Sequence, residues 1–126
     1  MITTKSLLGK RFLIVEDEFL IAMMLEDMLL ELGCVVAATA ARPAQAIGLI
    51  EEVQIDAAIL DVNLDGCDSF GIAAALRERQ VPFLFATGYG GSRVPPEFAA
   101  YQFIQKPYRL QELADALSRL SDGPAN

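Results

Sequence analysis

Short apolar segments alternate with longer segments of helical periodicity along this chain of 126 residues. The apolar segments are too short for helices and end at charged or turn-forming residues, so they predict buried strands. We place them at residues 11–15, 34–38, 55–60, 81–86 and 101–105. Strands that alternate with helices form a parallel sheet with helices on both faces, which predicts an α/β fold with a five-stranded parallel sheet.

The segments of helical periodicity predict helices at residues 18–32, 42–52, 69–79 and 108–120. Residues 88–96 are rich in Gly and Pro, so the helix expected before Tyr101, the fourth in the chain, should be short or irregular. Right-handed crossovers leave few topologies, and the flavodoxin-like strand order 2-1-3-4-5 fits best. We expect a single domain over residues 1–126, with a core at about 9–121 and a frayed C-terminal tail.

The composition excludes several classes of function. Hydrophobic residues make up 53% of the chain, but no apolar run reaches the length of about 18 residues that spans a membrane. The N-terminus does not resemble a signal peptide, so we expect a cytoplasmic protein with no membrane partner. The net charge of −7 opposes a phosphate backbone, so no binding to nucleic acid is expected. Cys34 and Cys67 have neither the number of a disulfide framework nor the spacing of a zinc site.

Polar residues follow four of the predicted strands at the point where each strand ends. Glu16 and Asp17 follow the first strand, Asp61 the third, Thr87 the fourth and Lys106 the fifth. Ligands of open parallel sheets bind beyond the carboxyl ends of the strands, so we expect these side chains to meet at one edge.

Carboxylates that are this close together require a compensating charge. Two carboxylates about 4 Å apart repel each other by roughly 4 kcal/mol at an effective dielectric constant near 20. A divalent cation offsets that repulsion, and a few carboxylates with a carbonyl and waters form the oxygen shell that Mg²⁺ favours. Lys106 supplies a further positive charge.

A metal, an ammonium and a hydroxyl around one carboxylate also describe a phosphoryl-transfer site. The carboxylate can then be the nucleophile, which yields an acyl phosphate. Asp61 is the best candidate because it stands alone at its strand end, whereas Glu16 and Asp17 are paired as a metal site requires.

These residues resemble the signature of two-component response-regulator receiver domains. The matching pieces, in the order of the family, are Val15-Glu16-Asp17, Leu60-Asp61, Thr87 and Lys106-Pro107. The resemblance covers nearly the whole chain and implies that Asp61 accepts a phosphoryl group from a sensor histidine kinase or phosphotransfer protein. It further implies that Asp17 ligates Mg²⁺ directly, that Glu16 acts through a water, and that Asn63 offers its backbone carbonyl to the metal.

By the same resemblance, Thr87 binds one phosphoryl oxygen after phosphorylation and Lys106 pairs with another. Phe103 precedes the lysine by three residues and takes the rotamer-switch position. Packing in the core is an equally good interpretation of Phe103. The Lys106–Pro107 bond is expected to be cis.

Residues 82–89 further resemble the receiver branch nicknamed FAT GUY after its motif. The chain also departs from the usual family pattern. Glu16 stands where Asp is commonest, and Asp65 stands where a Pro often follows the acceptor by four residues. The stretch rich in Gly and Pro replaces a well-formed fourth helix, which weakens the expectation of the usual signalling through that helix.

Other interpretations stay open. Residues 61–66 match the first half of an EF-hand calcium loop, but the twelfth position, which takes a bidentate Glu, is Ile72. A flavodoxin-like module that binds a nucleotide or flavin is a further class, although residues 88–91 form neither a Walker loop nor a dinucleotide fingerprint. Glu16 and Asp17 also suit the start of a helix, but capping does not explain the other strand ends.

We therefore expect a stand-alone receiver that takes a phosphoryl group on Asp61 with Mg²⁺ and acts in signalling rather than as a metabolic enzyme. Phosphorylation adds about one and a half to two negative charges, which would draw Thr87 inward and let Phe103 fill vacated space. Such a shift between conformations changes binding to an unknown downstream protein. The alternative output is a sink that drains phosphoryl groups from a shared kinase.

Overall fold

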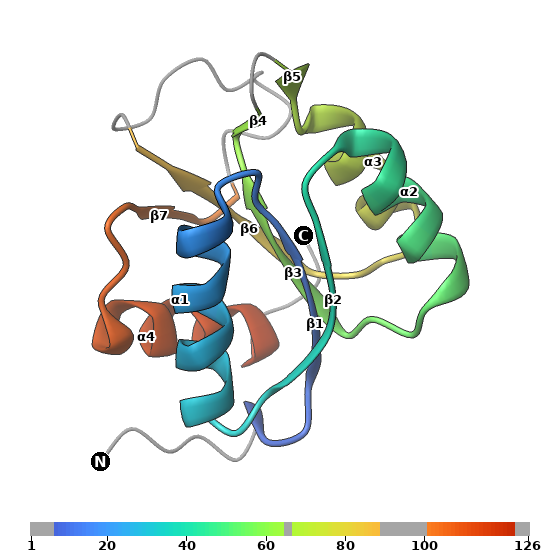
Figure 1. Cartoon of the computed structure of the whole chain (residues 1–126). Helices are drawn as coiled ribbons and strands as arrows, with labels where there is room; N and C mark the ends of the chain where they lie inside the picture. Colours follow the sequence, from blue (N-terminus) through green and yellow to red (C-terminus); the bar gives the residue numbers. More distant parts are fainter. Residues whose placement is uncertain (1–6, 65–66, 89–100, 123–126) are drawn as a thin grey trace.

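The structure, a computed structural model, describes residues 7–64, 67–88 and 101–122. Parallel strands form one sheet in the order β2-β1-β3-β6-β7, and β4 pairs with β5 in a short antiparallel hairpin (Figure 1). The strands are β1 (Arg11–Val15), β2 (Val35–Ala40), β3 (Ala57–Asp61), β4 (Asn63–Leu64), β5 (Cys67–Asp68), β6 (Phe83–Thr87) and β7 (Phe103–Gln105). The helices are α1 (Phe19–Glu31), α2 (Pro43–Glu52), α3 (Phe70–Glu78) and α4 (Leu110–Asp122). The large sheet has the predicted order 2-1-3-4-5, so the fold-class prediction is confirmed.

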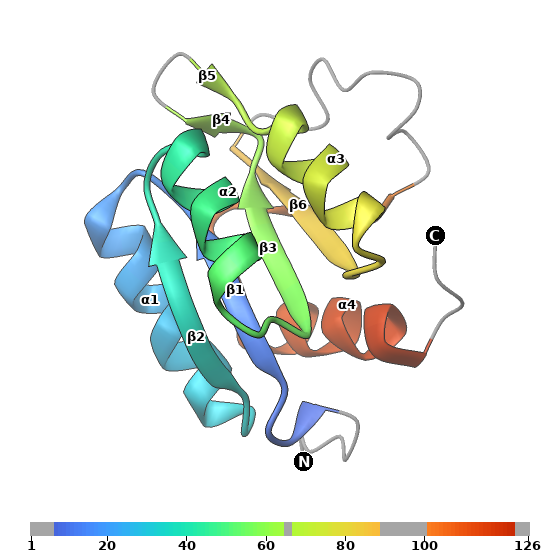
Figure 2. The ribbon, with the colours of Figure 1, turned by 90° about the vertical axis from the view of Figure 1, so that its right-hand side faces the viewer.

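Helices cover both faces of the sheet, with α1 and α4 on one face and α2 and α3 on the other (Figure 1 and Figure 2). Successive side chains of a strand point to opposite faces, so β1 contributes to both cores. Phe12 and Ile14 pack with α1 and α4, whereas Leu13 and Val15 pack with α2 and α3. All residues of β3 and β6 are buried, as expected for parallel strands covered on both sides. None of the helices in the described ranges has the length and apolar character to cross a membrane.

Some element boundaries differ from the predicted ranges because local hydrogen bonds decide them. Gly33 has a φ of 90° at the end of α1, and the N–H of Cys34 donates to the carbonyl oxygen of Leu29 at 2.9 Å. Cys34 therefore belongs to the turn that ends the helix, and β2 starts one residue later than predicted. Pro82 has no N–H to donate, so β6 starts at Phe83.

The segment that follows Asp61 corrects another prediction. Residues 61–66 lie between the predicted strand at 55–60 and the predicted helix at 69–79 and were expected to form a loop, whereas Asn63 pairs with Asp68 and Leu64 with Cys67. Leu64 is buried in the core formed with α2 and α3, which holds the hairpin against the domain. The short fourth helix predicted after β6, like Asp65, falls on residues outside the described ranges and stays a prediction.

Residues 7–10, which precede β1, also contribute to the core. Leu7 precedes the expected core range but is fully buried among residues of α1 and α4. The N–H of Gly9 donates to the carbonyl oxygen of Gly33 at 2.8 Å, which ties this segment to the turn that ends α1.

Candidate functional site

The polar residues singled out at the strand ends lie at one edge of the sheet. Glu16 and Asp17 directly follow β1, Asp61 is the last residue of β3, Thr87 is the last residue of β6, and Lys106 follows β7. Because β1 pairs with β3, β3 with β6, and β6 with β7, all in parallel, their carboxyl ends are adjacent. The topology thus brings together residues that lie far apart in the chain.

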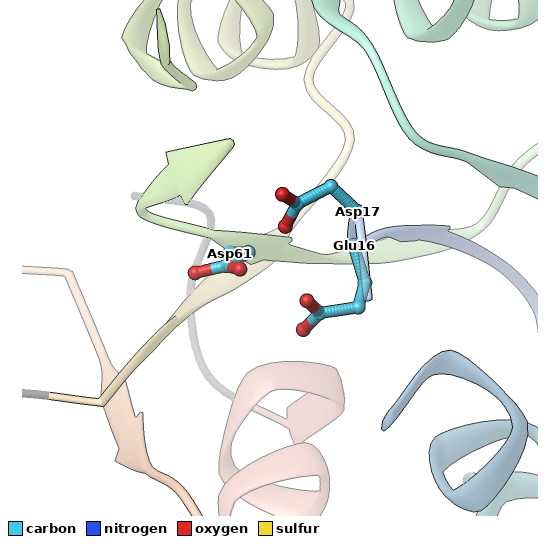
Figure 3. Close-up of side chains that lie close together, drawn as sticks. All are labelled: Glu16, Asp17 and Asp61. Carbon is cyan, nitrogen blue, oxygen red and sulfur yellow. The ribbon is translucent and has the colours of Figure 1, made fainter. Parts of the chain in front are cut away.

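Glu16, Asp17 and Asp61 form one acidic cluster. A carboxylate oxygen from each of the three lies within 4.8 Å of the others. Glu16 and Asp61 are buried, with 3% and 6% exposure, and Asp17 is half-buried. Figure 3 shows the Glu16 side chain on the side of α4 and the Asp17 side chain on the opposite side, with the Asp61 carboxylate beside them at a height between the two.

Lys106, which follows the edge strand β7, contacts this cluster. Its Nζ lies 2.8 Å from Oε1 of Glu16 and 3.0 Å from Oδ2 of Asp61. Its backbone N–H donates to the carbonyl oxygen of Thr87 at 2.9 Å, which continues the pairing between β6 and β7. The Lys106–Pro107 peptide bond is cis, the isomer that the resemblance implies. We call Glu16, Asp17, Asp61 and Lys106 together the acidic pocket.

Burial and neighbouring charges set the protonation of the pocket. Burial raises the pKa of Glu16 to about 7, the charge of Asp61 adds to the rise, and the contacts with Lys106 and the Glu18 backbone oppose it. The Glu18 N–H donates to Oε2 of Glu16 at 3.1 Å. Burial acts to lower the pKa of Lys106, but its contacts with Glu16 and Asp61 outweigh burial and raise that pKa. Lys106 is therefore charged at neutral pH, where Glu16 is close to its titration midpoint.

The donor set of the pocket fits Mg²⁺. The candidate ligands are carboxylate oxygens from Glu16, Asp17 and Asp61, which are the hard donors that Mg²⁺ prefers. When Glu16 is ionised, the three carboxylates and the Lys106 ammonium sum to two negative charges, the amount that one divalent cation neutralises. The pairing of β4 with β5 sets the backbone position of Asn63, whose carbonyl stays a predicted ligand.

Thr87 lies on β6, the strand next to that of Asp61, and Phe103 lies on β7, on the far side of β6. Thr87 is 6% exposed at the end of β6. Phe103 is half-buried and stacks on Phe85 with ring centroids 5.2 Å apart, against the core formed with α2 and α3. Phe103 thus packs on the core, one of the two interpretations that its sequence position allowed, and its role in a switch stays a prediction.

Tyr108 belongs to the surroundings of the pocket, although sequence analysis assigned it no role there. Its side chain is 5% exposed, and burial, followed by the charges of Glu16 and Asp61, raises the pKa of its phenol. Tyr108, Lys106 and Met24 are among the residues that line a cavity of about 220 Å³. The signal in the sequence was an aromatic residue directly after the Lys-Pro pair.

The outer side of α1 exposes large apolar side chains, a feature that sequence analysis also missed. Phe19, Leu20, Met23 and Met24 have exposures of 74%, 73%, 44% and 44%. These four residues, which we call the apolar rim, belong to the first turns of α1, at the edge of the sheet where β1 ends (Figure 1). The signal was present, since the start of the helix is apolar at more positions than one buried face requires.

Comparison with known protein families decides what kind of domain this is. The family model described as the response regulator receiver domain matches residues 12–118. The chain belongs to this family. The receiver domain predicted from the strand-end residues is therefore confirmed, and receiver domains of response regulators act in two-component signalling. The narrower resemblance to the FAT GUY branch stays a prediction.

Solved structures of other receiver domains share the fold. The solution structure of SdrG from Sphingomonas melonis Fr1 matches with a TM-score of 0.81 and 44% identity, over 93% of this chain and 98% of that one. The receiver domain of the sensor histidine kinase PA1611 from Pseudomonas aeruginosa PAO1 matches with a TM-score of 0.77 and 28% identity, over 90% of this chain and 98% of that one. That structure has a magnesium ion coordinated in its active site cleft.

Among curated relatives, the transcriptional regulatory protein TcrA of Mycobacterium tuberculosis is 36% identical over 118 residues. The match covers 90% of this chain and 46% of TcrA, so the chain spans about half the length of that relative.

The EF-hand interpretation is not favoured. Asp61, which would be its first ligand, ends strand β3, whereas an EF-hand loop follows a helix.

Proposed function

We propose that this receiver domain accepts a phosphoryl group on Asp61 from a phosphohistidine of a sensor histidine kinase or phosphotransfer protein. The observation that carries the proposal is the setting of Asp61. Its carboxylate is buried, lies 3.0 Å from the Lys106 ammonium, and shares a space with the carboxylates of Glu16 and Asp17. A carboxylate held beside positive charge in a site that excludes water is suited to attack a phosphoryl donor.

In the proposed reaction, an oxygen of Asp61 attacks phosphorus while the bond between phosphorus and the donor imidazole nitrogen breaks. The imidazole keeps the electron pair of that bond and takes up a proton, and Asp61 becomes an acyl phosphate. When held by Asp17, Asp61 and the Asn63 carbonyl, with Glu16 acting through a water, Mg²⁺ supplies neutralisation of the phosphoryl oxygens. The domain thereby contributes positioning and charge rather than a separate acid or base.

Lys106 and Thr87 bind the product in this proposal. The Lys106 ammonium pairs with one phosphoryl oxygen, and the Thr87 hydroxyl donates to another in a charge-assisted hydrogen bond. Phosphorylation adds about one and a half to two negative charges at Asp61, which draws Thr87 inward. Phe103 then moves into the space that Thr87 leaves, and the population shifts toward the active conformation.

The apolar rim supports a protein partner that covers the pocket during transfer. Asp61 is buried, so a phosphohistidine has to enter from the sheet edge at which α1 begins (Figure 1). Exposed apolar residues next to a reactive group are typical of protein interfaces. We infer that the phosphoryl donor contacts Phe19 and Leu20 while its histidine reaches Asp61.

The output of the domain is binding to another protein, or removal of phosphoryl groups from a shared kinase. The net charge of −7 supports protein partners over nucleic acid for this chain. In both cases phosphorylation of Asp61 is the event that has to be shown first.

Incubation with acetyl phosphate and Mg²⁺, followed by measurement of the intact mass, tests the chemistry. Wild type is expected to gain one phosphoryl group, and Asp61→Asn none, because the amide is not a nucleophile of this kind. Asp27→Asn is the matched control, since Asp27 is an exposed acid on α1. A phosphoryl group that Asp61→Asn still gains contradicts the proposal, as does a wild type that gains none from either acetyl phosphate or a histidine kinase.

A further inference from the structure

Glu16 and Asp17 are neighbours in the chain but lie on different sides of the strand end. The Asp17 carboxylate faces Asp61 from the side away from α4, while the Glu16 carboxylate lies on the α4 side (Figure 3). The side chain of Glu16 is 1% exposed, which is lower than the 8% exposure of the Asp61 side chain. The paired acids therefore have distinct surroundings.

Both oxygens of Glu16 are engaged by groups of the protein itself. Oε1 forms an ion pair with Nζ of Lys106 at 2.8 Å, and Oε2 accepts the Glu18 backbone N–H at 3.1 Å. The second contact holds one oxygen of the carboxylate, and the other oxygen lies within ion-pair distance of the lysine. Glu16 thus holds Lys106 from one side while Asp61 holds it from the other.

The contact between Lys106 and Asp61 is the one that the proposed reaction disturbs. Oδ2 of Asp61 lies 3.0 Å from Nζ, and this carboxylate has to serve as nucleophile and as ligand of Mg²⁺. Each of these roles withdraws negative charge from the ammonium, and the metal repels it as well. The Lys106 side chain is 15% exposed, so its ammonium can turn toward solvent when the contact with Asp61 is lost.

We propose that Glu16 is a positioning residue that retains Lys106 in the acidic pocket when the carboxylate of Asp61 is engaged elsewhere. This inference rests on the proposed function, because Lys106 matters there as the partner of a phosphoryl oxygen. Glu16 keeps Nζ on the α4 side of Asp61, ready to pair with that oxygen without first returning from solvent. The role in metal binding that the family resemblance gives Glu16, through a bridging water, leaves both of these contacts in place.

A contribution to folding stability alone explains the contact between Glu16 and Lys106 less well. Charges that are removed from water lose hydration, and a buried ion pair seldom repays that loss in full. A carboxylate that holds an ammonium beside a nucleophile has a use that an apolar pair would not serve. The test has to follow Lys106 itself, because stability alone does not separate the two explanations.

Side-chain NMR of lysine follows Lys106 directly, because the chain has only three lysines, Lys5, Lys10 and Lys106. The signal of the ε-methylene group of Lys106 is assigned by its loss in Lys106→Arg. Spectra are recorded for the metal-free protein, at saturating Mg²⁺, and in Asp61→Asn, which removes the Asp61 charge without any metal. Glu16→Gln is compared with the control Glu18→Gln. Glu18 lies two residues after Glu16 and its side chain is exposed, so the control removes one negative charge outside the pocket.

In the wild type and in Glu18→Gln, we expect the Lys106 signal to stay distinct from those of the other lysines when Mg²⁺ is added. In Glu16→Gln, Mg²⁺ is expected to move this signal to the position of the solvated lysines. In Asp61→Asn the Lys106 signal is expected to stay distinct. In the double variant Asp61→Asn/Glu16→Gln it is expected to move to the position of the solvated lysines. Phosphorylation by acetyl phosphate at saturating Mg²⁺ is expected to slow roughly tenfold in Glu16→Gln, the order of a lost charge-assisted contact.

The inference is overturned if Lys106 stays in place in Glu16→Gln with Mg²⁺ and in the double variant, or if it leaves the pocket in Asp61→Asn alone. It is equally overturned if Glu18→Gln behaves as Glu16→Gln does, because the effect is then one of general charge. Failure of the proposed function has a different signature. A wild type that never gains a phosphoryl group removes that function, while the lysine signals still report whether Glu16 holds Lys106.

Discussion

The acidic pocket and the apolar rim are adjacent regions in which the usual distribution of residues is reversed. In the pocket, charged side chains are buried together, with Glu16 at 3% and Asp61 at 6% exposure. In the rim, large apolar side chains face solvent, with Phe19 at 74% and Leu20 at 73%. Both reversals reduce the stability of the isolated domain, because charges lose hydration and apolar surface stays in water.

The difference between the two regions lies in what relieves each cost. In the pocket, the repulsion between buried carboxylates is reduced by Lys106 of the same chain. In the proposed function, Mg²⁺ reduces it further when a phosphoryl group is transferred. The rim is relieved only when another surface covers it. A small ion or a phosphoryl group completes the first region, and a protein completes the second, which suits a domain that receives a phosphoryl group from a protein donor.

The largest expected effect is a difference in folding stability between substitutions in the rim and in the core beneath it. Leu25→Ala, on the inner side of α1 with 1% exposure, is expected to lower the free energy of unfolding by about 3 kcal/mol. Leu20→Ala, on the same helix with 73% exposure, should change it by less than about 0.5 kcal/mol. Urea unfolding of both variants measures this. Similar losses in the two would show that the rim is part of the core and would break the comparison.

The rim should matter for the donor protein and not for the chemistry. Replacement of both Phe19 and Leu20 by Ser is expected to slow phosphoryl transfer from a histidine kinase roughly 30-fold. This corresponds to a loss of about 2 kcal/mol of interaction energy, as for central interface residues. Phosphorylation by acetyl phosphate should be unchanged, because a small donor does not contact the rim. Both rates are measured on the same preparation. A parallel loss with the two donors would place the rim in the chemistry instead.

Of the two regions, only the pocket contains titratable side chains, so only the pocket should make stability depend on pH. The pKa of Glu16 is raised from 4.5 to about 7 in the folded state, which therefore binds this proton more tightly than the unfolded state does. Its contribution is complete at low pH and is lost as pH rises through the folded value. We expect the free energy of unfolding without metal to fall by about 2.5 kcal/mol between about pH 5 and 8.

Glu16→Gln should flatten this dependence, since the amide does not titrate, whereas Leu20→Ala should preserve it. Urea unfolding at several pH values, without metal, makes the comparison. A slope that Glu16→Gln leaves intact would assign the dependence to other groups.

The smallest expected effect is stabilisation by the metal. At a Mg²⁺ concentration ten times its dissociation constant, binding to the folded state alone adds about 1.4 kcal/mol to the free energy of unfolding. Asp17→Asn should abolish the gain, because this residue is a proposed direct ligand, and Leu20→Ala should keep it. Thermal unfolding with and without Mg²⁺ is sufficient. An undiminished gain in Asp17→Asn would move the metal away from the pocket.

Periodicity and strand-end chemistry predicted much of this domain from the amino-acid order. Short apolar segments between helical ones predicted the sheet and its strand order, because few topologies satisfy right-handed crossovers. Glu16, Asp17, Asp61, Thr87 and Lys106 were placed at one edge by that topology alone. The metal site and Asp61 as nucleophile followed from the chemistry of carboxylates at adjacent strand ends. The roles of Asn63, Thr87 and Phe103 came from the family resemblance, and all of these roles stay predictions.

Other features were beyond local pattern. The hairpin of β4 and β5 was predicted as a loop, since two-residue strands are too short to show a periodicity. The exposure of Phe19 and Leu20 escaped notice because an apolar residue on a helix is ordinarily assigned to the core, and only packing shows which residues stay exposed.

The sequence by itself determined the class of fold, the edge at which chemistry is possible and the residue types present there. Only the tertiary structure decided that Glu16 and Asp17 lie on different sides of the strand end, and that Lys106 reaches both Glu16 and Asp61. The physical reason is that alternation and chemical type are local properties of the chain. Contacts between strand ends depend on register, side-chain length and the packing of helices that lie far apart in sequence.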